Sequence, residues 1–208
     1  MGMQLLERPL AQLPAADAER LVRGLFAPDQ RFARAFFHYW HRVLGHNEPT
    51  ARLETLIELT HAREHVLAHL DDPHYYTVGY VGARFEPIGM FGYRALAEHA
   101  VGAKLAPVIG RLCDGPYGIA HCVATIDSYA STAVLRTMFA SIALKAEARG
   151  DRRVVFFTSD HRLERLYRRF GMEFPPALAL PDSRHLVGMF DLERPDNRAR
   201  LDELPEAA

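Results

Sequence analysis

The chain has 208 residues, of which 49% are hydrophobic and 25% charged, and its formal net charge at pH 7 is −1. These values are typical of one well-buried globular domain, and they give no general electrostatic reason to expect nucleic-acid or membrane binding. No apolar run approaches the length of a membrane span, and the N-terminus lacks the features of a secretory signal. The two cysteines, Cys113 and Cys122, cannot form a disulfide scaffold, so we expect reduced thiols and a cytoplasmic location.

The first third of the chain is predicted to be mainly helical. A short strand at residues 4–6 precedes a helix at 14–26, an aromatic-rich helix at 29–44, and a helix from 48 to about 70. The aromatic residues of the second helix suit a core or an interface equally. They therefore leave the oligomeric state open, with a dimer as one alternative.

Strands and helices alternate in the remainder of the chain. The predicted strands occupy residues 75–81, 85–93, 118–126, 154–157 and 185–192. A long helix is predicted at 132–149, where Gly150 ends it. This order predicts a mixed α/β (α+β) fold with one central sheet. We expect a single domain over residues 1–194, with a mainly helical part at 1–72 and a core at 73–194, followed by a polar, frayed tail at 195–208.

Residues 152–174 form the most informative stretch, because strand, cap, helix and glycine follow one another in it. Thr158, Ser159 and Asp160 can cap a helix whose apolar face carries Tyr167, and Gly171 ends that helix. Residues 172–174 are then expected to return to an extended conformation.

The second half, roughly residues 75–192, resembles the GNAT superfamily of N-acyltransferases. Residues 160–172, DHRLERLYRRFGM, are similar to the family's late motif of an Asn, an apolar residue, Leu-Tyr, a Gly and an aromatic. Asp160 replaces the Asn and Met172 replaces the aromatic, while AEARG at 146–150 resembles the usual end of the preceding helix. The resemblance implies a GNAT-like mixed sheet flanked by helices, with a helical N-terminal cap, and transfer of an acyl group from a coenzyme A thioester to an amine.

The chain departs from the family at the pyrophosphate-binding turn. The family has Arg or Gln, two residues, Gly, one residue, then Gly or Ala at the start of the helix, whereas Ala130, Ala133 and Leu135 occupy these positions here. The helix N-terminus still offers free N–H groups. The resemblance therefore places the donor at Thr125, Ile126, Ser131, Thr132, Ala133, Val134, Leu135, Arg136 and Asp160.

The missing glycines leave several donors open. The donor can be acetyl-CoA or another acyl-CoA, an acyl carrier protein, or an aminoacyl-tRNA as in some unusual members of the family. A non-catalytic binding or regulatory module on the same fold is a further alternative.

Two residues are candidates for catalysis. Tyr167 can protonate the leaving thiolate, and His121, in the predicted strand 118–126, is a tentative base for the attacking amine. Because neighbouring strand residues point to opposite faces, we expect His121 and Cys122 not to face the cleft together. Tyr80, Tyr93 and His99 are candidates for binding a small amine or amino acid.

A histidine stripe suggests a different class of function. His61, His65 and His69 are spaced four residues apart, and His61 also belongs to the patterns H-x-x-E-H and E-x-x-H. Such spacing can place two imidazoles on one metal ion. Since no second Glu-x-x-His is evident, we expect a solvated stripe without metal and keep a histidine-ligated metalloenzyme as the alternative.

Overall fold

The computed structural model describes residues 4–27, 30, 60, 63–99, 107, 109–111, 114–129, 131–158, 161–178 and 186–202. The helix expected at 29–44 lies outside these residues except for Gln30. Of the helix expected from 48 to about 70, Thr60 and residues 63–70 are described; Thr60 and residues 63–67 are helical, and residues 68–70 form turns.

A six-stranded mixed sheet forms the centre of the described part of the chain, with its strands side by side in sequence order. The strands are β1 (Gln4–Pro9), β2 (Tyr75–Val81), β3 (Phe85–Ala95), β4 (Tyr117–Thr125), β5 (Arg153–Thr158) and β6 (Leu186–Asp191). Neighbouring strands are antiparallel, except that β4 and β5 run parallel. The predicted mixed fold with one central sheet is confirmed.

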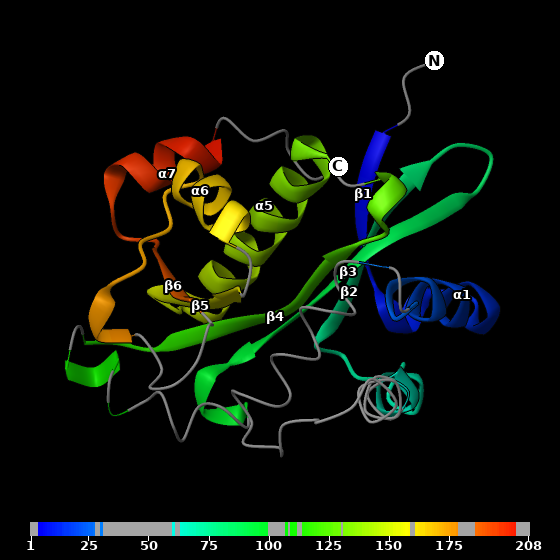
Figure 1. Ribbon diagram of the computed structural model, residues 1–208, viewed down its shortest axis with the longest axis horizontal. Coiled ribbons are helices and arrows are strands. Elements are labelled where there is room, and N and C mark those ends of the chain that lie inside the picture. The colour runs from blue at the N-terminus through cyan, green and yellow to red at the C-terminus, as the bar shows by residue number, and fades with distance from the viewer. Residues whose placement is uncertain are drawn as a thin grey trace.

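Helices cover both faces of this sheet. The helices α5 (Thr132–Arg149), α6 (His161–Arg169) and α7 (Pro195–Asp202) lie on one side, and α1 (Ala15–Leu25) lies on the other (Figure 1). Short 3-10 helices connect the larger elements: η1 (Leu10–Gln12), η3 (Leu96–Glu98), η4 (Asp127–Tyr129) and η5 (Pro176–Leu178).

Three buried clusters lie against the sheet among the described residues, and two of them are used here to assign its faces. The cluster under α5 and α6, here called the α5-side core, includes Phe91, Met138, Phe156 and Tyr167 among its members. The cluster under α1, here called the α1-side core, includes Leu21, Leu25, Tyr75, Met90 and Ala124. Because successive strand residues alternate between faces, membership of one core shows which side of the sheet a strand residue faces.

The bounds of α5 agree with the predicted helix because both of its ends carry strong signals. The Oγ of Ser131 accepts a hydrogen bond from the backbone N–H of Val134 at 3.3 Å, which is an N-cap contact. At the other end Gly150 has a φ of 75°, the left-handed conformation that glycine adopts without strain. Gly171, with a φ of 92°, follows α6 in the same way.

Two segments near the C-terminus are shorter or more ordered than a continuous strand and a frayed tail. Within residues 172–174, only Glu173 pairs, in an isolated antiparallel bridge to Met189. The tail expected to fray begins with α7, whose Asn197 is buried and donates from Nδ2 to the carbonyl oxygen of Asp191 at 2.8 Å. This contact fixes the first turn of α7 to the end of β6.

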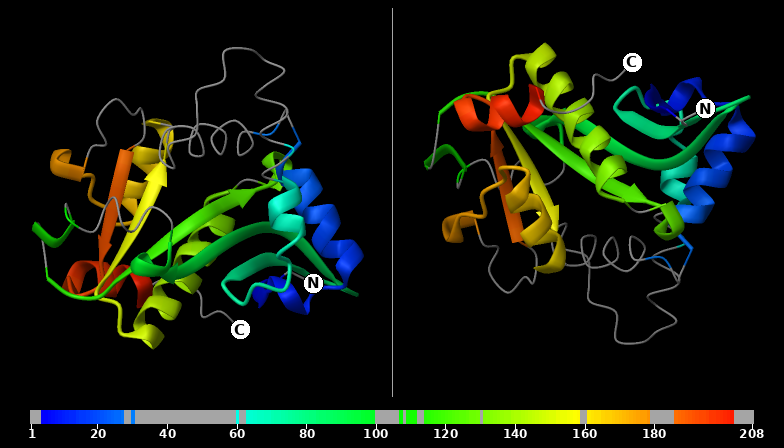
Figure 2. Two further views of the ribbon diagram at one scale, coloured as in Figure 1. Left: turned by 90° about the horizontal axis from the view of Figure 1, so that it is seen from below. Right: turned by 90° about the horizontal axis from the view of Figure 1, so that it is seen from above.

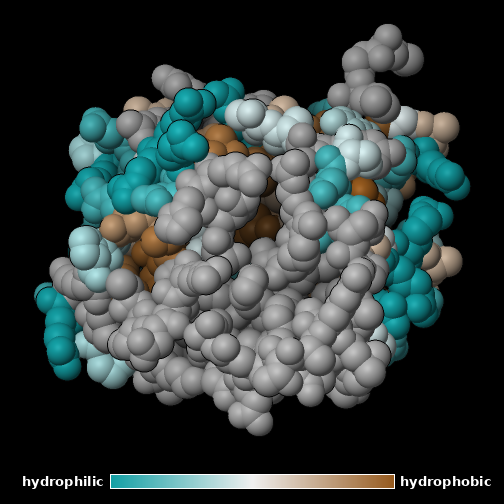
Figure 3. Space-filling view, viewed as in Figure 1, coloured by the Kyte–Doolittle hydropathy of each residue, from teal (hydrophilic) through white to brown (hydrophobic). Residues whose placement is uncertain are grey.

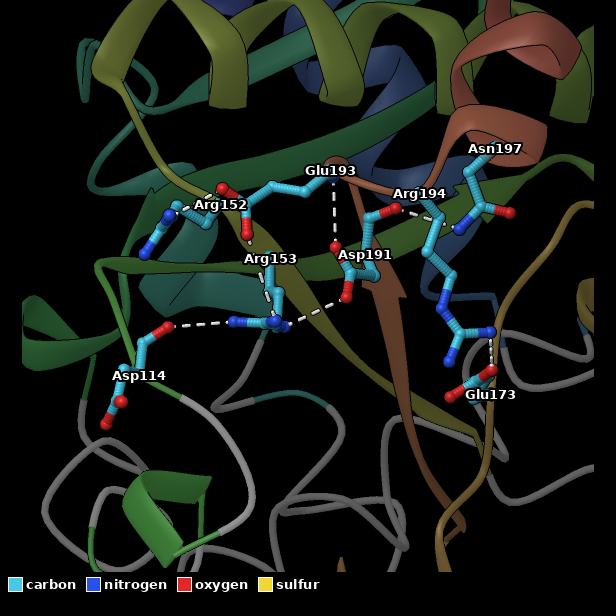
Figure 4. Close-up of polar contacts among 8 residues, drawn as sticks. All are labelled: Asp114, Arg152, Arg153, Glu173, Asp191, Glu193, Arg194 and Asn197. Atoms are coloured by element: carbon cyan, nitrogen blue, oxygen red, sulfur yellow. Dashed lines mark hydrogen bonds and ion pairs between the residues drawn. The ribbon is translucent and has the colours of Figure 1, made fainter.

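Ion pairs join the same corner of the sheet to its neighbours (Figure 4). Arg153 donates to Asp191 at 3.2 Å and to the carbonyl oxygen of Asp114 at 2.8 Å, while Arg152 pairs with Glu193 at 2.6 Å. These contacts link the start of β4, the start of β5 and the end of β6. None of the helices among the described residues is both long and apolar enough to cross a membrane.

Candidate active site

The parallel strands β4 and β5 separate after a short paired stretch. Their pairs are Tyr117 with Arg153, Gly118 with Val154, and Ile119 with Val155. Beyond these pairs β4 continues to Thr125 and β5 to Thr158, and the two strands diverge (Figure 2). The space-filling view shows a hollow with apolar atoms at its base near the middle of one face (Figure 3). Beyond these three pairs, β4 and β5 form no ladder with each other among the described residues, and the facing edges of separated strands can bind an extended ligand.

A β-bulge interrupts β4 beside this opening. Met90 pairs with Ala124 and Gly92 pairs with His121, so Phe91 lies opposite two residues, Cys122 and Val123. Cys122 has a φ of 51°, which is unusual for a residue other than glycine. Bulges bend a strand and leave one residue unpaired, and they are frequent next to active sites.

The bulge overturns the expectation that His121 and Cys122 face opposite sides. The ring of His121 contacts that of Tyr75, with centroids 5.6 Å apart, and Cys122 packs against the α1-side core to which Tyr75 belongs. Both side chains therefore face the α1 side of the sheet. Burial raises the pKa of the Cys122 thiol to about 12, so it is not a thiolate at neutral pH.

His121 is held in a buried position on that face. It is 9% exposed, and its Nε2 has no hydrogen-bond partner among the described residues. Burial, and then the nearby His99 and Arg94, lower the pKa of His121 well below its ordinary value. The imidazole is therefore neutral at neutral pH, the state in which a histidine can accept a proton.

His99 lies directly beside His121, with ring centroids 4.9 Å apart. Burial, and then the charge of Arg94, lower the pKa of His99 to about 4. The structure thus brings together one residue predicted for catalysis and one predicted for acceptor binding.

Tyr167 lies on the opposite, α5 side. Its ring is 5% exposed and meets Phe139 edge-on at a centroid distance of 5.3 Å. It shares the α5-side core with Ala120 and Phe156, the first residues after the last pair between β4 and β5. Tyr167 is therefore part of the buried wall next to the point where the two strands separate.

The expected donor residues are divided between the surface and the core. Ser131, Thr132, Ala133 and Arg136 are exposed around the N-terminus of α5, whereas Val134 is buried and Leu135 half-buried. Thr125 and Ile126, also half-buried, precede this turn; Ile126 packs against the α1-side core, and its N–H donates to the carbonyl oxygen of Ile88 at 3.0 Å. Asp160 lies outside the described residues.

The expected acceptor residues do not come together. The hydroxyl of Tyr93 donates to the buried Asp151 carboxylate at 2.6 Å, and both Tyr93 and Tyr80 pack in the α5-side core. His99 lies on the other face, beside His121. The geometry therefore separates the two tyrosines from His99.

Sequence reasoning missed a polar group next to the two histidines. Arg94 donates from Nη2 to Asp72 at 2.8 Å, and Asp72 also accepts from the backbone N–H and the ring of His74, at 2.8 and 2.9 Å. Burial raises the pKa of Asp72, but these hydrogen bonds and the Arg94 charge outweigh burial and lower it. The sequence hinted at this group only by an arginine directly after the predicted strand 85–93, which is a weak indication of a functional residue.

The histidine stripe forms a local contact on the surface. The rings of His65 and His69 lie 4.4 Å apart, and the Nδ1 of His69 lies 2.7 Å from the carbonyl oxygen of His65. His61 is outside the described residues. Within the described ranges there is no group of three or more side chains that could hold a metal ion.

No family model matches the sequence, and no curated protein matches it significantly. Solved structures do match the fold. An uncharacterised protein from Bacillus halodurans has a TM-score of 0.64 at 13% identity, with 97% of this chain and 90% of that chain covered.

Two similar structures are acetyltransferases by name. An arylalkylamine N-acetyltransferase-like protein from a mosquito has a TM-score of 0.55 at 12% identity. A Drosophila melanogaster polyamine N-acetyltransferase, which catalyses the formation of N-acetylagmatine, has a TM-score of 0.52 at 12% identity. For each of them 90% of this chain and 98% of the other chain are covered. The chain therefore has the GNAT fold that these two acetyltransferases share, at 12% sequence identity to each.

Proposed function

We propose that the protein is an N-acyltransferase that moves an acyl group from a thioester donor to the amine of a small molecule or amino acid. The observation that carries this proposal is the separation of β4 from β5 beside a bulge in β4. His121 lies on one side of the sheet there and Tyr167 on the other. A thioester lying in the gap would have a base candidate and an acid candidate on its two sides.

The proposed reaction is a direct transfer. The neutral amine attacks the thioester carbonyl carbon, a C–N bond forms, and the tetrahedral intermediate expels the thiolate as the C–S bond breaks. His121, neutral because it is buried, accepts the proton that the amine loses. The hydroxyl of Tyr167 donates a proton to the thiolate and recovers one from solvent after the products leave. Backbone N–H groups near the bulge would stabilise the oxyanion.

The donor is proposed to place its phosphates at the N-terminus of α5. The exposed Ser131, Thr132 and Arg136 surround this end, and its N–H groups carry the positive end of the helix dipole. Ala133 and Leu135 stand where glycines let a pyrophosphate approach the backbone in the family that this chain resembles. We therefore propose acyl-CoA as the first donor to test and a carrier-bound or tRNA-bound acyl group as the next.

A direct experiment measures both the binding of acyl-CoA and the transfer of its acyl group. The melting temperature should rise on addition of acetyl-CoA or a longer acyl-CoA, because a ligand that binds only the native state stabilises it. Release of free thiol in the presence of an amine panel would then report transfer. Arg136→Glu should weaken binding, while Arg84→Glu, in the exposed β2–β3 turn, should not.

A non-catalytic binding module is the second candidate. The observation that favours it is that side chains, rather than glycines, occupy the first turn of α5. A thermal shift with coenzyme A but no thiol release with any acyl donor would favour the module. If no acyl-CoA changes the melting temperature but an acyl carrier protein releases thiol, the protein would still be an acyltransferase, and its donor would be the carrier-bound acyl group.

A further inference from the structure

Two buried nitrogen atoms on the α1 side of the sheet have no hydrogen-bond partner in the part of the chain that the structure describes. They are Nε of Arg94 and Nε2 of His121, and among the described residues the one other unpaired buried side-chain atom is Oγ of Ser141 in α5. Buried polar atoms in native proteins are nearly always paired, because an unpaired one forfeits its hydrogen bond to water. Two such atoms on neighbouring side chains therefore suggest a bound group that hydrogen-bonds to both.

The strand register places these two side chains next to each other. Gly92 pairs with His121, and Arg94 pairs with Ile119, two residues earlier in β4. Gly92 and Arg94 point to the same face because one residue, Tyr93, separates them. Arg94 and His121 are therefore diagonal neighbours, whose backbones lie roughly 7–8 Å apart in an antiparallel pair.

The surrounding contacts hold Arg94 in a fixed orientation. Its Nη2 donates to Asp72 at 2.8 Å, and Asp72 is itself held by the backbone N–H and ring of His74. This ion pair uses one edge of the guanidinium and leaves the Nε–H available for a second acceptor. The charge of Arg94 also reaches the histidine pair, since it contributes to lowering the pKa of both His99 and His121.

Building on the proposed function, we propose that the acceptor is an amine that carries a carboxylate, and that Arg94 binds this carboxylate through Nε while the amine lies at His121. A carboxylate oxygen is the acceptor that the unpaired Nε–H lacks, and the hydrogen bond is charge-assisted. The amine of an amino acid is one carbon away from its carboxylate, so a short molecule can reach both nitrogens. A plain amine, without the carboxylate, leaves Arg94 Nε unpaired.

The test compares amino acids with the amines that remain when the carboxylate is removed. The matched pairs are L-tyrosine with tyramine, L-ornithine with putrescine, and L-lysine with cadaverine. In wild type we expect binding and kcat/KM to favour the amino acid of at least one pair by about 10- to 100-fold. Arg94→Lys keeps a cation for Asp72 but lacks the Nε–H, so the preference for the amino acid over the plain amine should fall to about one.

Controls separate folding from recognition. Arg84→Lys, at an exposed turn, should leave the preference intact, and Arg94→Met should abolish it if that variant folds. A wild-type preference for the plain amines, or a preference retained in Arg94→Lys, would overturn the inference.

Binding measured by calorimetry without any donor distinguishes this inference from the proposed function. Arg94-dependent amino-acid binding without acyl transfer supports the carboxylate site and counts against the proposed catalysis. Acyl transfer to amines with no carboxylate preference supports the catalysis and overturns the carboxylate site. An absence of amino-acid binding in wild type also overturns the carboxylate site.

Discussion

Gly92 and His121 face each other across the pair of β3 and β4, and a Cβ atom at Gly92 would lie 2.2 Å from Cε1 of the His121 ring. No Cβ can come that close, so the imidazole occupies its position because residue 92 is a glycine. The small residue on β3 therefore sets the place of the candidate base on β4.

Gly92→Ala should displace the His121 ring and reduce acyl transfer. The new methyl group collides with a side chain rather than with backbone, so we expect the ring to turn away at a stability cost of about 1–3 kcal/mol. If His121 is the base, kcat/KM should fall by about 100-fold or more. Steady-state kinetics and urea unfolding measure the two effects. Gly82→Ala is the matched control, since a Cβ there meets nothing within 4 Å; unchanged kinetics in Gly92→Ala would exclude His121 as the base.

Tyr167→Phe should distinguish the catalytic role of the Tyr167 hydroxyl from the packing role of its ring. The ring packs against Phe139 in the α5-side core, and phenylalanine preserves that packing. We expect a loss of turnover of about 100-fold with a small change in melting temperature, because a general acid contributes roughly that much. Tyr167→Leu should lower both turnover and stability, as it removes the aromatic contact as well. Full turnover in Tyr167→Phe would mean that another group protonates the thiolate.

The two buried imidazoles predict how stability depends on pH. The pKa values of His99 and His121 lie below their ordinary value of 6.5 in the folded protein, so the unfolded chain takes up protons first on acidification. Their contribution to stability is present above pH 6.5 and is lost as the pH falls, toward about 4 for His99. His99→Gln should therefore show a smaller loss of unfolding free energy between pH 7 and pH 5 than wild type. Urea titrations at the two pH values measure this, with the exposed His69→Gln as control; equal losses in wild type and His99→Gln would contradict it.

The sequence predicted those elements whose ends carry local signals. Ser131 and Gly150 define α5 because a cap and a left-handed glycine act within a few residues of the chain. The bulge in β4 carries no such signal, because Cys122 has a positive φ without being glycine, and tertiary contacts must impose that conformation. The same holds for α7, whose polar sequence gave no reason to expect the buried Asn197.

The candidate site was predictable only in part for the same reason. His121 and Tyr167 followed from their position in a strand and in a motif, whereas the contact between His99 and His121 depends on the path of the chain after β3. The pairing of Arg94 with Asp72 joins residues 22 positions apart, and no periodic pattern encodes it.

The hydrogen bond between Tyr93 and Asp151 gives the last prediction. The hydroxyl donates at 2.6 Å to the buried Asp151 carboxylate, which also accepts from Nε of Arg149 at 3.3 Å, so removing the hydroxyl leaves Asp151 under-satisfied. Tyr93→Phe should lower the unfolding free energy by about 1–3 kcal/mol without changing KM for any acceptor.

The contribution of Tyr93 to the free energy of unfolding should also depend on pH. Burial, and then the hydrogen bond to Asp151, raise its pKa in the folded protein above the ordinary value of 10.0. Its stabilisation is therefore present below pH 10 and is lost as the pH rises further, because the unfolded chain releases the phenolic proton first. Wild type should lose more stability than Tyr93→Phe between pH 9 and pH 11 in thermal unfolding. A changed acceptor KM with no loss of stability would instead place Tyr93 in the acceptor site.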